Sequence, residues 1–166
     1  TTITVAMAPD VGSADVADKA HSVTAGGSTG AGYDGTININ PSFGTEALSG
    51  LNLFVGAHYT EHYDETSNLN DRYEGVGGIT MDIGPVSLGY ATSGIATGKT
   101  VTKSDTDWYK NHMYGISFNI NDDLSVSYGQ HESTSGYVSP DVQESVTTEV
   151  TSFQVAYTMG GASIRY

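Results

Sequence analysis

Hydrophobic and polar residues alternate along most of this chain. In the segment LNLFVGAHYT (51–60), odd positions are apolar or aromatic and even positions are mainly small or polar. The segments VSLGYA (86–91), YGISFNI (114–120), LSVSYG (124–129) and SFQVAYTM (152–159) repeat this pattern. Alternation with a period of two puts the two sets on opposite faces of a β-strand. The pattern therefore predicts β-strands that each have one apolar face.

The alternation predicts eight strands and the start of a ninth. Arg72–Ile83 is the least regular of them, because Gly75, Gly77 and Gly78 interrupt it. No helical stripe persists for three turns, so the predicted fold class is all-β. The expected strands are Thr1–Met7, Tyr33–Asn40, Leu51–His62, Arg72–Ile83, Val86–Gly94, Trp108–Ile120, Leu124–Ser133, Val146–Met159 and a ninth from Ala162 onward.

The connections between these strands alternate in length. Tight turns are expected at 84–85, 121–123 and 160–161. Long polar segments are expected at 8–32, 63–71, 95–107 and 134–145, and a shorter connection at 41–50 alternates with them as the tight turns do. An antiparallel up-and-down meander with its long loops at one end explains this alternation.

Composition narrows the class of protein. Hydrophobic residues make up 37% of the chain and charged residues only 15%, and the longest apolar runs fall far short of the ~20 residues of a transmembrane helix. With no cysteine, the chain offers no disulfide and no thiolate. The net charge of −13, with six Lys and Arg residues, argues against a nucleic-acid partner, because phosphate binding needs clustered cations.

The direction in which the apolar face points decides between two interpretations. In a transmembrane barrel the apolar set faces lipid and the other set lines the lumen. That other set is rich in Ser, Gly, Asn and Thr and poor in charge, whereas a water-exposed sheet face usually carries more Lys and Glu. Strands of roughly 9–12 residues also suit a tilted bilayer crossing. The alternative is a soluble or surface-exposed all-β binding module of adhesin type.

Several segments carry a resemblance to a known family. LNLFVGAHYTEHYDE (51–65), GPVSLGYATSG (84–94), YGISFNINDDLSVSYGQHE (114–132) and FQVAYTMGGASIRY (153–166) resemble the Gram-negative general porins of alphaproteobacterial type. The resemblance covers nearly all of the chain, although its motifs are hairpin signatures rather than a unique fingerprint.

The resemblance implies an outer-membrane barrel of sixteen strands, assembled as a homotrimer, through which small hydrophilic solutes and ions diffuse. Residues 1–166 would then be a single porin domain, incomplete at both ends, with about eight or nine of the strands. The family's constriction loop matches no segment securely, and Ala8–Gly32 is the longest loop. Outer-membrane lipid is the implied environment.

Strand parity names the residues expected to line the pore. Their small and polar side chains leave room for water, and the excess of acid predicts a mild preference for cations. The expected lining residues are Asn52, His58, Arg72, Glu74, Ser87, Asn111, Ser117, Ser125, His131, Gln154 and Arg165.

Other candidate chemistry is weaker. His58 and His62 lie four apart, which on a strand is ~13 Å and too far for one metal ion. The loop 64–75 lacks the Gly and Glu of an EF-hand, so a solvated loop is favoured over loose divalent-cation binding by acidic loop residues. No nucleophile motif or phosphate loop is present, so neither an enzyme nor a cofactor is expected. The acidic loop residues concerned are Asp64, Glu65, Asp71, Asp105 and Asp107.

Overall fold

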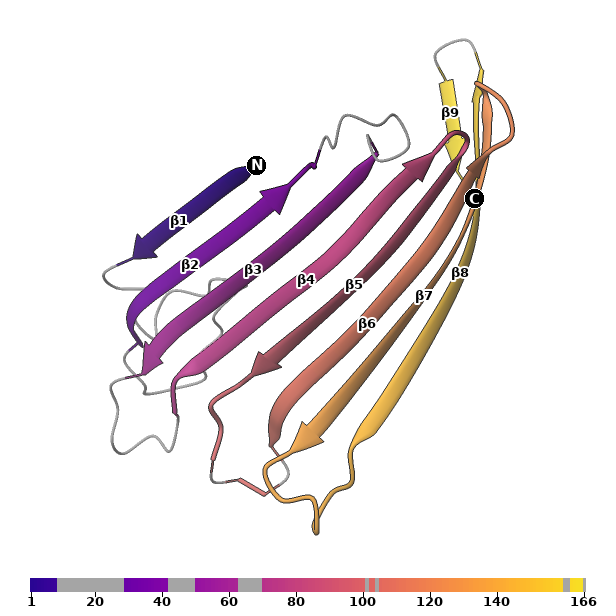
Figure 1. The fold of residues 1–166 in the computed structure, drawn as a ribbon. Coiled ribbons are helices and arrows are strands. Elements are labelled where there is room, and N and C mark those ends of the chain that lie inside the picture. The colour runs from indigo at the N-terminus through magenta and orange to yellow at the C-terminus, as the bar shows by residue number, and fades with distance from the viewer. Residues whose placement is uncertain are drawn as a thin grey trace.

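The chain folds into one antiparallel β-sheet. A computed structural model describes residues 1–8, 29–41, 50–62, 70–100, 102–103, 105–159 and 162–165. In this part of the chain, nine strands pair in the order in which they occur, from β1 to β9 (Figure 1). The predicted all-β, up-and-down meander is therefore confirmed.

The strand bounds agree closely with the alternation in the sequence. β3, β4 and β8 have the predicted limits, whereas β2 begins earlier and β5 ends later than expected. The strands are β1 (Thr2–Ala8), β2 (Thr29–Ile39), β3 (Leu51–His62), β4 (Arg72–Ile83), β5 (Val86–Ala96), β6 (Thr106–Asn119), β7 (Leu124–Tyr137), β8 (Val146–Met159) and β9 (Ala162–Arg165).

Two predicted boundaries were wrong by four residues: β2 begins at Thr29 rather than Tyr33, and the end of β7 is displaced as well. β7 was expected to end at Ser133 but continues to Tyr137, so the following connection is shorter than the predicted 134–145. The extra residues pair with the start of β6, for example Gly136 with Trp108. Backbone hydrogen bonds between strands form whether or not apolar and polar residues alternate. Polar residues such as Thr134 and Ser135 therefore extend β7 although the alternation does not predict it.

Tight turns close one end of the sheet. Gly84 begins the β4–β5 turn with a φ of +57°, a conformation that glycine adopts without a steric penalty. In the β6–β7 turn, the side-chain oxygen of Asn121 accepts hydrogen bonds from the backbone N–H groups of Asp123 and Leu124, both at 2.9 Å. Figure 1 shows these two turns at the same end of the sheet, with the β5–β6 and β7–β8 connections at the other. We call these the turn end and the loop end.

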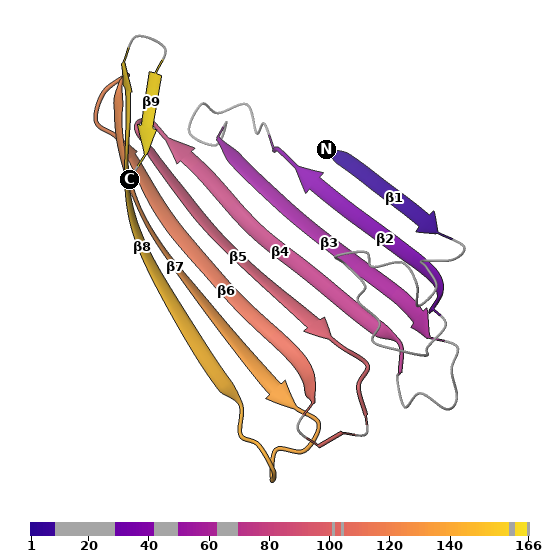
Figure 2. The same ribbon diagram turned by 180° about the vertical axis from the view of Figure 1, so that it is seen from behind.

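The nine strands form a single layer in both views (Figures 1 and 2). Ala31 is the one buried hydrophobic side chain among the described residues. Large apolar side chains are instead exposed across the sheet, for example Val5 at 80% and Phe153 at 65%. The described residues therefore contain no hydrophobic core.

Candidate functional site

The strand register sorts the side chains into two faces. Directly paired residues on neighbouring strands lie on the same face, and successive residues along a strand alternate between faces. We call the face that contains Val55 the apolar face. It consists of the residues paired with Val55 on neighbouring strands and of every second residue along each strand from these positions. His58, Glu74 and the residues that share their parity form the polar face.

All the predicted pore-lining positions fall on the polar face. His58 pairs with Glu74, and Ser117 pairs with both Ser87 and Ser127. Arg165 occupies this face by its backbone register, opposite Ala156. The strands spread the others over the whole face; these are Asn52, Arg72, Asn111, Ser125, His131 and Gln154.

A polar cluster lies at the loop end of β2, β3 and β4. The His58 ring lies between two side-chain oxygens: its Nδ1 is 2.7 Å from Asp34 Oδ1, and its Nε2 is 2.6 Å from Thr60 Oγ1. Thr60 is fully buried, whereas 56% of the Asp34 side chain is exposed. The two contacts hold the imidazole in one orientation across the β2–β3 pair.

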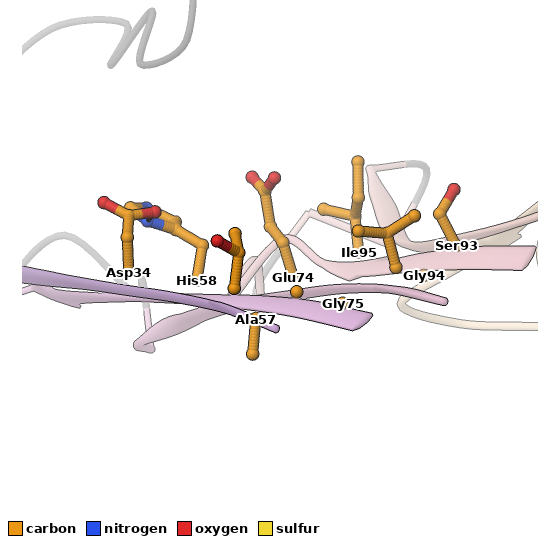
Figure 3. A pocket seen from close by; sticks show the side chains of 11 residues that line it. Asp34, Ala57, His58, Glu74, Gly75, Ser93, Gly94 and Ile95 are labelled. Carbon is orange, nitrogen blue, oxygen red and sulfur yellow. Dashed lines mark hydrogen bonds and ion pairs between the residues drawn. The ribbon is translucent and has the colours of Figure 1, made fainter. Parts of the chain in front are cut away.

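The cluster continues onto β4. The Arg72 guanidinium binds Glu74, with 2.5 Å between Nη2 and Oε1. Asp34, His58 and Glu74 are successive partners in one register row and rise from the same side of the sheet, opposite to Ala57 (Figure 3). They border a hollow of about 260 Å³.

Asp34 is a member of this cluster that the sequence analysis did not single out. It alternates with Tyr33 and Gly35, so the parity of β2 alone places it on the polar face. Its contact with His58 depends on the β2–β3 register, which the sequence pattern does not specify.

The turn end of the polar face is lined by very small side chains. Gly89, Gly115 and Gly129 are successive partners on β5, β6 and β7. Ser87, Ser117 and Ser127 form the adjacent row. Together with Gln154 and others they line an open hollow of about 490 Å³. Side chains of this size leave the backbone surface accessible to water.

Phe54 is a large apolar residue on the polar face. It pairs with Gly78 on β4, and its ring lies over the position that a side chain at Gly78 would occupy. The alternation on β3 places Phe54 on the polar face, opposite to Leu53 and Val55. Only the β3–β4 register shows that Gly78 leaves space for the Phe54 ring.

On the opposite, apolar face, each strand from β2 to β8 carries an aromatic side chain, and on β6 Trp108 lies closer to the loops than Tyr114. On β2, β3 and β4 this residue is a tyrosine. The Tyr33 and Tyr59 rings stack with centroids 6.0 Å apart, and the Tyr59 and Tyr73 rings are tilted to each other with centroids 5.0 Å apart. The hydroxyl of Tyr59 donates a hydrogen bond to Asp71 at 2.8 Å. We call the full set the aromatic line; it consists of Tyr33, Tyr59, Tyr73, Tyr90, Tyr114, Tyr128 and Phe153, one on each strand from β2 to β8.

Polar residues follow the aromatic line toward the loops. Two positions beyond the aromatic residue stand Glu61 on β3 and Asp71 next to β4. The equivalent residues on β6, β7 and β8 are polar or charged as well, namely His112, Gln130 and Thr151, and Lys110, Glu132 and Glu149 lie one step further. The alternation in the sequence predicts an apolar face and does not indicate this polar zone.

The acidic loop residues do not form a metal site in the part that the structure describes. No group of three or more His, Cys, Asp or Glu side chains there is arranged to hold a metal ion. Asp71 accepts the hydrogen bond from Tyr59, and Asp105 lies 3.9 Å from the ammonium group of Lys99. Asp64, Glu65 and most of the 8–32 segment lie outside the described residues.

Comparison with known proteins adds no relative. No protein-family model matches the chain, and no curated protein matches it either. Among the described residues, no helix is long and apolar enough to cross a membrane.

Proposed function

We propose that this sheet is part of the wall of an outer-membrane porin, through which small hydrophilic solutes and ions diffuse passively. The observation that carries the proposal is the contrast between its two exposed faces. One face presents apolar and aromatic side chains, such as Val55, Leu88 and Ile116. The other presents mainly hydroxyls, amides and glycines, with exposed Val76, Tyr109 and Val150 among them. A single layer with this contrast suits a wall between lipid and water.

A soluble β-module fits the same observations less well. A soluble sheet buries its apolar face against a second layer, which supplies most of its stability. Here Ile79, Leu88, Tyr114, Ile116 and Phe153 are 40–65% exposed. Burial of such side chains contributes about 1.5–3 kcal/mol each. In the proposed barrel, the bilayer takes the place of the missing layer.

The polar face supports diffusion rather than tight binding. Its turn end is lined by glycines and serines, and its loop end carries Asp34, Arg72 and Glu74 in contact with water. Exposed charges of this kind bias the passage of ions through a hydrated channel without holding them. The chain's own residues therefore act by shape and charge, and no bond is made or broken.

Closure of the wall is part of the proposal. β1 and β9 each pair with a single neighbour among the described residues, so further strands are needed to satisfy both edges. The resemblance of the hairpins to general porins favours a sixteen-stranded barrel and a homotrimer.

Single-channel recording tests the proposal. The full-length protein, purified in detergent and added to a planar lipid bilayer, is expected to produce discrete conductance steps that increase in proportion to the KCl concentration. Gly89→Trp should lower the step size, because Gly89 lies on the polar face beside Thr80 and the indole would project into the channel.

Leu88→Trp is the matched control. Leu88 precedes Gly89 and lies on the apolar face, so the same added volume should leave the conductance unchanged. A protein that stays monomeric in buffer without detergent and produces no conductance would refute the pore and favour the binding-module alternative.

A further inference from the structure

The hollow of about 260 Å³ at the loop end of the polar face lies over two register rows of β2–β5. The row nearer the loops consists of Asp34, His58, Glu74 and Ile95, and the next row consists of Thr36, Gly56, Val76 and Ser93. Gly56 leaves the second row without a side chain at its centre. A Cβ atom there would lie 3.2 Å from Val76 Cγ1 and 3.4 Å from Thr36 Cγ2, so glycine keeps the floor of the hollow low. We call this space the Gly56 hollow.

One side of the Gly56 hollow is charged. Asp34 and Glu74 rise from the same side of the sheet, with His58 between them (Figure 3). Glu74 is bound to the Arg72 guanidinium, so with a neutral imidazole Asp34 supplies the net negative charge of the cluster. The Asp34 side chain is 56% exposed, and a carboxylate accepts several hydrogen bonds at once. Asp34 can therefore bind a cation while it keeps its contact with His58.

The other side of the Gly56 hollow is apolar, although it belongs to the polar face. Val76 is 38% exposed, and Ile95 is half-buried beside Glu74 (Figure 3). Ile95 also pairs with Tyr109 on β6, whose side chain is 38% exposed. In a water-filled channel, such apolar surface gains free energy when a solute covers it. An open hollow with apolar lining and a few polar groups is typical of a small-molecule site.

The distance between the two sides suits a short alkyl chain. Asp34 and Val76 are two strands and two residues apart, which places their Cα atoms ~12 Å from each other. An ammonium–carboxylate contact of ~2.8 Å, a four-carbon amine of ~5 Å and a methyl contact of ~3.8 Å together span this distance. The chain would lie across the hollow above Gly56.

We propose that the Gly56 hollow is a weak binding site for small alkylammonium ions. The ammonium group binds Asp34, and the alkyl chain crosses Gly56 and ends against Val76 and Ile95. This proposal rests on the proposed pore, to which it adds a class of solute that the channel favours. Weak binding suits that role, because a solute that passes through a channel must also leave the site.

The two sides of the hollow together select this class of ligand. An inorganic cation gains nothing from Val76 and Ile95. In the part of the chain that the structure describes, no group of three or more His, Cys, Asp or Glu side chains is arranged to hold a metal ion. Asp34 repels an anion, and a neutral alcohol of the same length lacks the charge-assisted hydrogen bond to its carboxylate.

Ligand-observed NMR tests the site. n-Butylammonium chloride is titrated into the full-length protein in micelles of deuterated detergent, and saturation transfer from protein to ligand gives the dissociation constant, with empty micelles as background. Affinity should fall by about two- to four-fold for each carbon removed between n-butylammonium and ethylammonium, because each methylene covers part of the apolar side. n-Butanol should bind more weakly than n-butylammonium.

Two matched pairs of variants locate the binding. Asp34→Asn should weaken n-butylammonium binding by about two- to five-fold at low salt. Asp82→Asn deletes the same charge from the same face, but Asp82 lies eight residues along β4 from Glu74, ~26 Å away, so the affinity should not change. Val76→Thr should weaken binding by about two-fold. Val150→Thr, at another exposed valine of the polar face, should have no effect.

The outcomes separate failure of the site from failure of the pore. Equal affinities for ethylammonium and n-butylammonium, or equal losses within either pair of variants, would overturn the assignment of the Gly56 hollow. Single-channel recording of the same preparations supplies the second readout. A protein that conducts KCl but does not bind n-butylammonium refutes the site and keeps the pore. Binding that depends on Asp34 and Val76 in a protein that produces no conductance keeps the site and refutes the pore.

Discussion

Two adjacent glycines on β4 differ in the room available to a side chain. A Cβ atom at Gly78 would lie 2.7 Å from the carbonyl oxygen of Tyr90 and would overlap the Phe54 ring. A Cβ atom at Gly77, on the other face, would meet nothing closer than the Phe54 carbonyl oxygen at 3.7 Å. The first glycine is therefore required by its neighbours, and the second is not.

We accordingly expect opposite effects from the two alanine substitutions. Gly78→Ala should lower the free energy of unfolding by about 1–3 kcal/mol through overpacking. Gly77→Ala should leave it unchanged or raise it by about 0.4–1 kcal/mol, because alanine reduces the entropy of the unfolded chain. Urea titration of the folded protein in lipid vesicles, followed by tryptophan fluorescence, measures both. Equal losses of stability in the two variants would contradict the role given to the Phe54–Gly78 contact.

At the scale of strands, neighbouring positions should respond differently to the same charge. Ile116 lies on the apolar face and Ser117 on the polar face of β6. Ile116→Lys puts an ammonium group in hydrocarbon and should reduce the stability of the membrane-inserted state by ~2–4 kcal/mol. Ser117→Lys puts the group in the channel and should change stability by less than about 1 kcal/mol. The yield of detergent-resistant folded protein on reconstitution measures the difference, and a larger loss for Ser117→Lys would reverse the assignment of the faces.

The alternation in the sequence predicts some features of the strands and not others. Alternation gave the limits of β3, β4 and β8, and it gave the correct face for His58, Glu74 and Gln154. These features depend on residues that are close in the sequence. The contact between Asp34 and His58 depends instead on the pairing register of two strands, as does the contact between the Phe54 ring and Gly78. Shifting one strand by two residues relative to its neighbour leaves every side chain on the same face. The alternation alone therefore does not show which residues of two strands are paired.

For the whole molecule, the distribution of charge predicts the selectivity of the channel. The chain has a net charge of −13. The polar face of β1–β5 carries the carboxylates Asp34, Glu74 and Asp82 and the guanidinium of Arg72, and Arg165 on β9 occupies the same face by its backbone register. Because Arg72 is bound to Glu74, the remaining negative charge should enrich cations in the channel. We expect the reversal potential in a KCl gradient to have the sign of a cation-preferring pore.

Removing one carboxylate from the polar face should weaken this preference. Asp34→Asn leaves an amide beside His58 and deletes a charge whose side chain is 56% exposed. A unit charge in water acts on an ion at ~4 Å with about 1 kcal/mol, and salt screens much of this, so the cation-to-anion permeability ratio should fall by about two-fold. Glu132→Gln deletes the same charge on the opposite face, outside the channel, and should leave the ratio unchanged. The selectivity mechanism would be wrong if the wild-type pore prefers anions or if the two variants shift the reversal potential equally, because the preference would then not come from the charges that line the polar face.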